Sequence, residues 1–161
     1  MNGSTENRAS SAFERPGRPD AVLSLATANE MLQLVRPIVA DILRHQRRLE
    51  GLRPELDRLD RNRRTLAWPQ RQRRYEIKEE VNYTEIELLD ALAELEVLGL
   101  TLIDAEDGRI GFPTVVNDRR AFFSWKPGEE AVASWHFAAE SVRRPIPPHW
   151  SKPTERIANK V

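Results

Sequence analysis

The segment IKEEVNYTEIELLDALAELEVLGLTLIDAEDGRIGF, residues 77–112, decides the fold, because its hydrophobic period changes at Gly99. Before Gly99, apolar or small side chains recur at alternating intervals of four and three residues, which is the spacing of one helix face. They are Ile77, Val81, Thr84, Leu88, Ala91, Leu95 and Leu98. After Gly99 the period is two, as in a half-buried strand. Glycine readily adopts the left-handed backbone that ends a helix, so we predict a helix that ends at Gly99 and a sheet directly after it.

An earlier stretch carries a second helical stripe, made by Leu32, Val35, Val39, Ile42, Gln46 and Leu49 and continued by Leu56, Leu59 and Leu66. Ser24, or Thr27 together with Glu30, supplies an N-cap signal. Pro37 predicts a kink in this helix, and residues 51–54 mark a second weak point. Two apolar stripes joined by a polar turn near residues 68–69 predict a long antiparallel helical hairpin over about 24–99.

The strand-like segments are LTLID, RIGF with TVV, RRAFFSW and AVASWHF, separated by the turn sequences DG, ND and KPGE. They predict a four-stranded antiparallel β-meander over about 100–138, and residues 22–23 are expected to add a short strand. Alternation places Trp125 with Phe123, and Trp135 with Phe137. We expect this aromatic face to cover the base of the hairpin, with His136 on the other face.

The chain of 161 residues suits one domain of the α+β class. We place this domain at 21–143, after a disordered arm at 1–20 that is rich in Ser, Gly, Pro and charge. Residues 144–161 contain four prolines and are expected to form a Pro-rich, disordered tail.

The 25 basic and 25 acidic residues cancel overall but are unevenly distributed. Residues 53–74 carry eight arginines against three acids, and residues 75–107 carry one lysine against eleven acids. The molecule is therefore dipolar, which bears on its partners. The absence of cysteine is compatible with a reducing cytoplasm. No apolar run approaches the roughly 18 residues of a membrane span, so we expect a cytoplasmic protein without a membrane partner.

A set of residues in the C-terminal half resembles a known family pattern. In chain order the matching residues are Ala28-Asn29, Phe112-Pro113, Trp125, Gly128-Glu129, Trp135-His136 and Arg143 through Pro145. This order resembles a prokaryotic family catalogued as domain of unknown function 2203, over about residues 22–146. The resemblance implies a fold but no established activity. The chain departs from the family pattern at Phe137, where an acidic residue is common, and in a shorter, glycine-free segment before Arg143.

The arginine-rich stretch around the expected hairpin tip is a candidate nucleic-acid site, made by Arg58, Arg61, Arg63, Arg64, Trp68, Arg71, Arg73 and Arg74. Arginines contact phosphates, and an exposed tryptophan can stack on an unpaired base. Four to six phosphate contacts would give a salt slope of about −3 to −5. Alternatively, the arginines pair with acids of the second helix at a solvated tip.

The Trp-His strand end is a second candidate site, made by Trp125, Trp135, His136, Glu140, Arg143 and Arg144. One interpretation is a small-ligand pocket, or a general base at His136. The other is a structural histidine that is hydrogen-bonded to a carbonyl or carboxylate. The three histidines (His45, His136 and His149) lack metal-ligand spacing, so no metal site is predicted.

No phosphate-binding loop, dinucleotide fingerprint or hydrolase nucleophile motif occurs in the chain. We therefore predict no enzyme activity, no catalytic residue and no cofactor. The stripes allow two hairpins to pack into a four-helix homodimer. Our sequence-based hypothesis is a non-catalytic protein-protein interaction or scaffold protein that self-associates through its hairpin. The alternatives are single-stranded RNA or ribosome-associated binding through the tip, and the small-ligand pocket.

Overall fold

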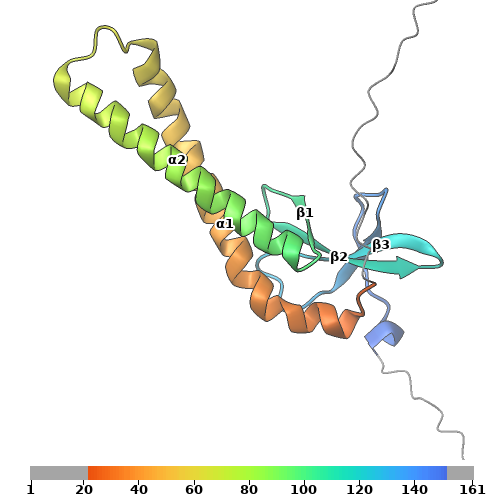
Figure 1. Ribbon diagram of the computed structural model, residues 1–161. Helices are drawn as coiled ribbons and strands as arrows, with labels where there is room; N and C mark the ends of the chain where they lie inside the picture. The colour runs from red at the N-terminus through yellow and green to blue at the C-terminus, as the bar shows by residue number, and fades with distance from the viewer. Residues whose placement is uncertain (1–21, 152–161) are drawn as a thin grey trace, which may run out of the picture.

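The computed structural model describes residues 22–151, which form a long helical hairpin with a small sheet at its base (Figure 1). The helices are α1 (Leu25–Arg61) and α2 (Trp68–Val97). The strands are β1 (Thr101–Asp104), β2 (Arg109–Val116), β3 (Arg119–Trp125), β4 (Ser134–Phe137) and β5 (Arg144–Pro145), followed by the 3-10 helix η1 (Pro148–Ser151). The predicted α+β class, helical hairpin and antiparallel meander are confirmed.

The start of α1 and the end of α2 coincide with capping signals in the sequence. The Ser24 hydroxyl accepts a hydrogen bond from the backbone N–H of Thr27, which selects Ser24 as the N-cap of α1. Gly99, at φ +75°, follows the C-cap of α2. Its N–H donates to the carbonyl of Glu96, while Leu100 N–H donates to Leu95. This is the Schellman arrangement, so Gly99 turns the chain from the hairpin into the sheet.

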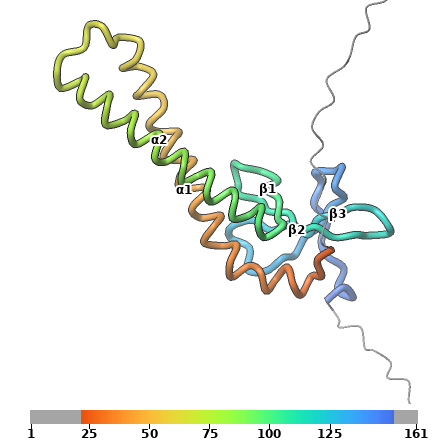
Figure 2. Tube along the Cα trace, viewed as in Figure 1, coloured from red at the N-terminus to blue at the C-terminus, as the bar shows by residue number. Residues whose placement is uncertain are grey.

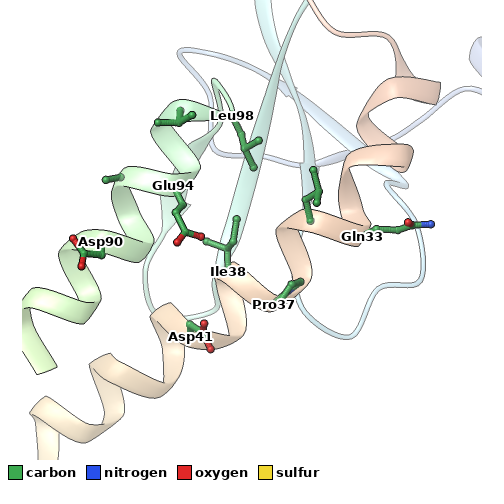
Figure 3. Close-up of a pocket in the computed structure, with 10 residues that line it drawn as sticks. Gln33, Pro37, Ile38, Asp41, Asp90, Glu94 and Leu98 are labelled. Carbon is green, nitrogen blue, oxygen red and sulfur yellow. The ribbon is translucent and has the colours of Figure 1, made fainter.

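The two helices pack along stripes close to the predicted ones. Figure 2 shows α1 and α2 side by side from the sheet to the far tip. The half nearer the tip has its own apolar cluster of Leu49, Leu52, Leu59, Leu66, Ile77 and Val81. The half nearer the sheet belongs to the main core. Pro37 and Pro54 both lie within α1. The helix bends close to Pro37 (Figure 3), as expected for a residue that lacks the backbone N–H and whose ring clashes with the preceding turn.

The sheet is an antiparallel meander with the strand order β1-β2-β3-β4-β5. The turn between β2 and β3 has two positive φ angles, at Asn117 (51°) and Asp118 (58°), which is the type I′ geometry expected of a tight hairpin. Cross-strand pairs place Phe112, Phe123 and Trp135 in one row. This row joins the main core with Trp125, Val35 and Val39. The aromatic face therefore covers the hairpin base, as predicted.

The prediction of four strands and of a tail beginning at 144 was wrong for residues 144–151. Arg144 pairs with Trp135 in a fifth strand, and Ile146 N–H donates to the Ala133 carbonyl at 3.0 Å. Pro145 has no N–H, but an edge strand of two residues tolerates that loss. Trp150 of η1 then packs on Trp135, with ring centroids 5.3 Å apart. The segment is thus part of the domain.

Residues 22–23 form no strand, but Leu23 N–H donates to the Pro113 carbonyl at 2.8 Å. The predicted arm at 1–20 and the remainder of the predicted tail, 152–161, lie outside the described residues.

Candidate interaction surfaces

The hairpin tip presents an exposed aromatic residue among arginines. Trp68 is the first residue of α2 and is 72% exposed. Leu66 is buried beneath the turn and anchors it in the tip cluster. A hollow of about 350 Å³ lies beside it, lined by Arg63, Arg64, Leu66, Arg71, Arg74 and Tyr75. The structure thus brings four of the eight predicted tip residues, Arg63, Arg64, Arg71 and Arg74, around a small concave surface.

The tip arginines divide into paired and unpaired groups. Arg73 contacts Glu55 at 3.1 Å and Glu76 at 3.9 Å, and Arg74 contacts Asp60. Arg61 and Arg71 donate to the carbonyls of Asp57 and Leu66. Within residues 22–151, the side chains of Arg58, Arg63 and Arg64 make no hydrogen bond or ion pair. Part of the set is therefore ion-paired, mainly with acids of α1 rather than with the expected acids of the second helix, and nucleic-acid binding stays a prediction.

The residues of the predicted Trp-His site are divided between the two faces of the sheet. Trp125 and Trp135 are buried in the core on the helix side. Arg144 lies on that side too, with its guanidinium 5.2 Å from the Trp135 ring and 2.7 Å from the Glu140 carboxylate. His136 lies on the other face, beside Phe122. Its Nδ1 lies 2.9 Å from the Phe137 carbonyl, which is the structural contact that the second interpretation anticipated.

Arg143 and Glu129 form the most connected polar contact of that second face. The guanidinium of Arg143 reaches both carboxylate oxygens of Glu129, at 2.8 and 2.9 Å. It also donates to the hydroxyl of the fully buried Ser124 at 2.7 Å and to the Ser124 carbonyl at 3.2 Å. A bidentate, charge-assisted pair of this kind fixes geometry as well as adding stability. It ties the segment before β5 to β3.

The pKa of Glu129 lies below the ordinary value of a glutamate. Partial burial by itself would raise this pKa. The hydrogen bond from Arg143, the backbone N–H of Lys126 and the positive charges of both residues outweigh it and lower the pKa. Glu129 is therefore held as a carboxylate.

The loop at 126–133 is fixed by residues of the family pattern. The Trp125 indole N–H donates to the Glu129 carbonyl at 2.9 Å, and Val132 N–H donates to the side-chain oxygen of Asn29 in α1 at 2.8 Å. Together with the Arg143 pair, these bonds join α1, β3, the loop and β5. These contacts of the family-pattern residues hold the sheet to the hairpin.

A groove opens between the helices close to the sheet, where the bend at Pro37 carries α1 away from α2 (Figure 3). Its volume is about 750 Å³. Leu34, Pro37, Ile38, Val97 and Leu98 supply apolar surface, and three carboxylates and further side chains complete the lining: Gln33, Asp41, Asp90, Ala93 and Glu94. It is thus an apolar groove with an acidic rim.

The outer face of α2 carries a second apolar stripe, opposite the one that packs on α1. At about 100° per residue, its members lie on the far side of the helix from Ile77. They are exposed, and they are Trp68, Tyr75, Tyr83, Ile86, Leu89 and Val97. Our sequence analysis missed this stripe and the groove. Apolar residues at 86, 89 and 97, which fall outside the buried repeat, were the signal that could have revealed the stripe.

Two further observations concern possible metal ligands and membrane spans in the described part of the chain. Residues 22–151 contain no group of three or more His, Asp or Glu side chains placed to hold a metal ion. No helix in that range is long and apolar enough to cross a membrane.

The hairpin, the meander and the loop network define a small α+β protein with a projecting helical arm. Comparison with protein families adds one result: the family described as uncharacterized conserved protein (DUF2203) matches residues 22–146, and the chain belongs to that family. Searches of curated proteins and of solved structures gave no significant match.

Proposed function

We propose that this is a non-catalytic, cytoplasmic interaction or scaffold protein that self-associates through its helical hairpin. The observation that carries the proposal is the exposed apolar stripe of α2. A helix on the surface of a monomer normally has one apolar stripe, and it faces the core. α2 has two, and its outer one includes Ile86, which is 57% exposed. Several exposed apolar residues gathered on one face of a helix mark a candidate interaction site.

The buried polar residues support a structural role for the sheet. The Arg143 guanidinium is engaged by Glu129 and Ser124, and His136 is buried with Nδ1 against a carbonyl. The Arg143 contacts hold the segment before β5 to β3 and to the loop at 126–133, whereas the His136 contact lies within β4 and its Nε2 is buried without a hydrogen-bond partner in residues 22–151. The surface left for a partner is therefore the helical arm rather than the Trp-His end.

Light scattering on the full chain and on two variants tests this proposal. Ile86→Glu places a charge in the stripe of both copies of a symmetric dimer, so we expect the dissociation constant to rise by about 100-fold or more. Val142→Glu is the matched control: Val142 is also exposed, at 67%, but lies between β4 and β5, far along the chain from α2. Its dissociation constant should stay unchanged.

The alternative function is RNA binding, which is favoured by the unpaired Arg58, Arg63 and Arg64 close to Trp68. To test it, a labelled single-stranded RNA is titrated with the unmodified chain. Suppose that the chain has the mass of a monomer and binds this RNA with a salt slope near −3, and that the double variant Arg63→Gln with Arg64→Gln no longer binds it. Nucleic-acid binding would then replace self-association as the function. If the unmodified chain is a dimer and Ile86→Glu leaves its mass unchanged, the outer stripe of α2 is not the dimer interface.

A further inference from the structure

Charge is distributed along α2 in the opposite sense to the one that stabilises a helix. Residues 68–78 carry four basic residues and one acid, while residues 79–97 carry seven acids and no base. The first turn has no acid and the last turn has no base. Because the N-terminus of a helix is the positive end of its dipole, this pattern disfavours an isolated α2. The distribution therefore calls for an explanation outside the helix.

Pairing with α1 explains the middle of the pattern and part of its basic end. Arg48 contacts Glu80, Arg53 contacts Glu85 at 3.0 Å, and Arg73 and Arg74 contact Glu55 and Asp60. At the sheet end, Asp90, Glu94 and Glu96 make no ion pair within residues 22–151. At the tip, Arg58, Arg63 and Arg64 make no hydrogen bond or ion pair within those residues. The two ends of the arm thus carry unneutralised charge of opposite sign.

The apolar features are arranged in the same end-to-end way. The outer stripe runs from Trp68, at the basic end, to Val97, at the acidic end. Val97 also lines the groove beside Leu34 and Pro37. One end of the arm therefore projects an exposed indole, and the other end offers an apolar groove with an acidic rim.

We propose that the partner of this surface is a second copy of the same chain, packed antiparallel so that each α2 lies against the other. The inference rests on the proposed self-association and gives it a geometry. A two-fold axis near Asn82, at the middle of α2, lays the basic half of each helix on the acidic half of the other. It also brings Trp68 of each copy to the groove of its partner.

The antiparallel arrangement accounts for two observations that a parallel one does not: the charge pattern, and the exposed indole at the opposite end of the arm from the groove. In a parallel pair, like-charged halves would lie together and repel. Both indoles would also meet each other, and the grooves would face each other empty. In the antiparallel pair each tip arginine approaches carboxylates, and an isologous interface buries both stripes at once. Electrostatic complementarity of this kind sets the register and orientation of an interface.

Distances between spin labels test the orientation, and the cysteine-free chain makes single labelling simple. Asn82 and Glu96 are both exposed on α2, so the single variants Asn82→Cys and Glu96→Cys each provide one labelling site. In the antiparallel dimer, the two labels at 82 should lie within about 20 Å. The two labels at 96 should lie about 40 Å apart, from the rise of about 1.5 Å per residue.

A parallel dimer would give short distances at both sites and would overturn the inference while leaving self-association intact. A monomer mass for the unmodified chain would overturn both. The mass of each labelled variant is measured first by light scattering. If the label at 82 prevents association, Lys78→Cys serves at the exposed edge of the stripe, where the same short distance is expected.

Discussion

Trp68 and Val97 are the first and last residues of α2, and they lie exposed on the same face of that helix. The helix rises about 1.5 Å per residue, so its 30 residues separate them by about 45 Å. Neither side chain is needed to pack α2 on α1. A face that carries exposed apolar residues from end to end, with opposite charge at its two ends, matches the same face of an inverted copy. This relationship is the basis of the proposed assembly.

Replacing Arg143 with lysine should destabilise the fold. Lysine cannot reach both oxygens of Glu129 and the two Ser124 acceptors at the same time, because its ammonium is a single point charge. We expect a loss of about 1–3 kcal/mol in the free energy of unfolding, measured by urea denaturation. Arg58→Lys is the control, because Arg58 is exposed and has no partner in the described range, and it should change stability by less than about 0.5 kcal/mol. Equal effects in both variants would contradict the structural role of Arg143.

Acid should weaken the same contact. The folded-state pKa of Glu129 is lowered below its ordinary value of 4.5, so folding favours the carboxylate. The contribution is fully present above the ordinary pKa and is lost as pH falls through the lower, folded value. Glu129→Gln should therefore lower stability at pH 7 and show a smaller further loss than the unmodified chain between about pH 5 and pH 3. Glu130→Gln, at the exposed neighbour, should follow the unmodified chain. An unchanged acid loss in Glu129→Gln would contradict the assignment.

Removing the side-chain acceptor at position 29 should release the loop before β4. Asn29→Ala leaves the Val132 N–H without its partner, at a cost of about 1–2 kcal/mol. The Val132 amide should then exchange with solvent faster, as measured by NMR hydrogen exchange. Asn29→Asp keeps an acceptor oxygen and should retain most of the protection. Unchanged exchange in Asn29→Ala would show that other contacts hold this loop.

Local sequence signals predicted much of this architecture. Gly99 fixed the boundary between hairpin and sheet because its φ of +75° is a backbone conformation that glycine adopts without strain. The buried repeats predicted the α1-α2 contact, and Asn117-Asp118 predicted the β2-β3 turn. These features depend on residues close together in the chain.

Features that depend on residues far apart in the chain could not be predicted from the sequence. β5 was missed because prolines around 145 argue against a strand, and its anchor at Glu129 lies 14 residues before Arg143. The groove was missed because it forms only where the bend at Pro37 moves α1 away from α2, and the direction of that bend cannot be read from the sequence. The outer stripe of α2 was missed because the regular buried repeat by itself accounts for an amphipathic helix, and the outer apolar residues are separated by polar ones. Which tip arginines are unpaired depends on where the acids of α1 fall in space.

Sedimentation equilibrium of the unmodified 161-residue chain over a range of protein and NaCl concentrations is the most direct test of self-association. We predict a mass that rises from 18.5 kDa to twice that value as the protein concentration rises. It also predicts that salt weakens the dimer, because complementary charges at the two ends of the arm are screened beyond about 10 Å at 0.1 M salt. A mass that stays at 18.5 kDa at every concentration would contradict self-association. A dimer that salt strengthens would contradict the antiparallel charge pairing.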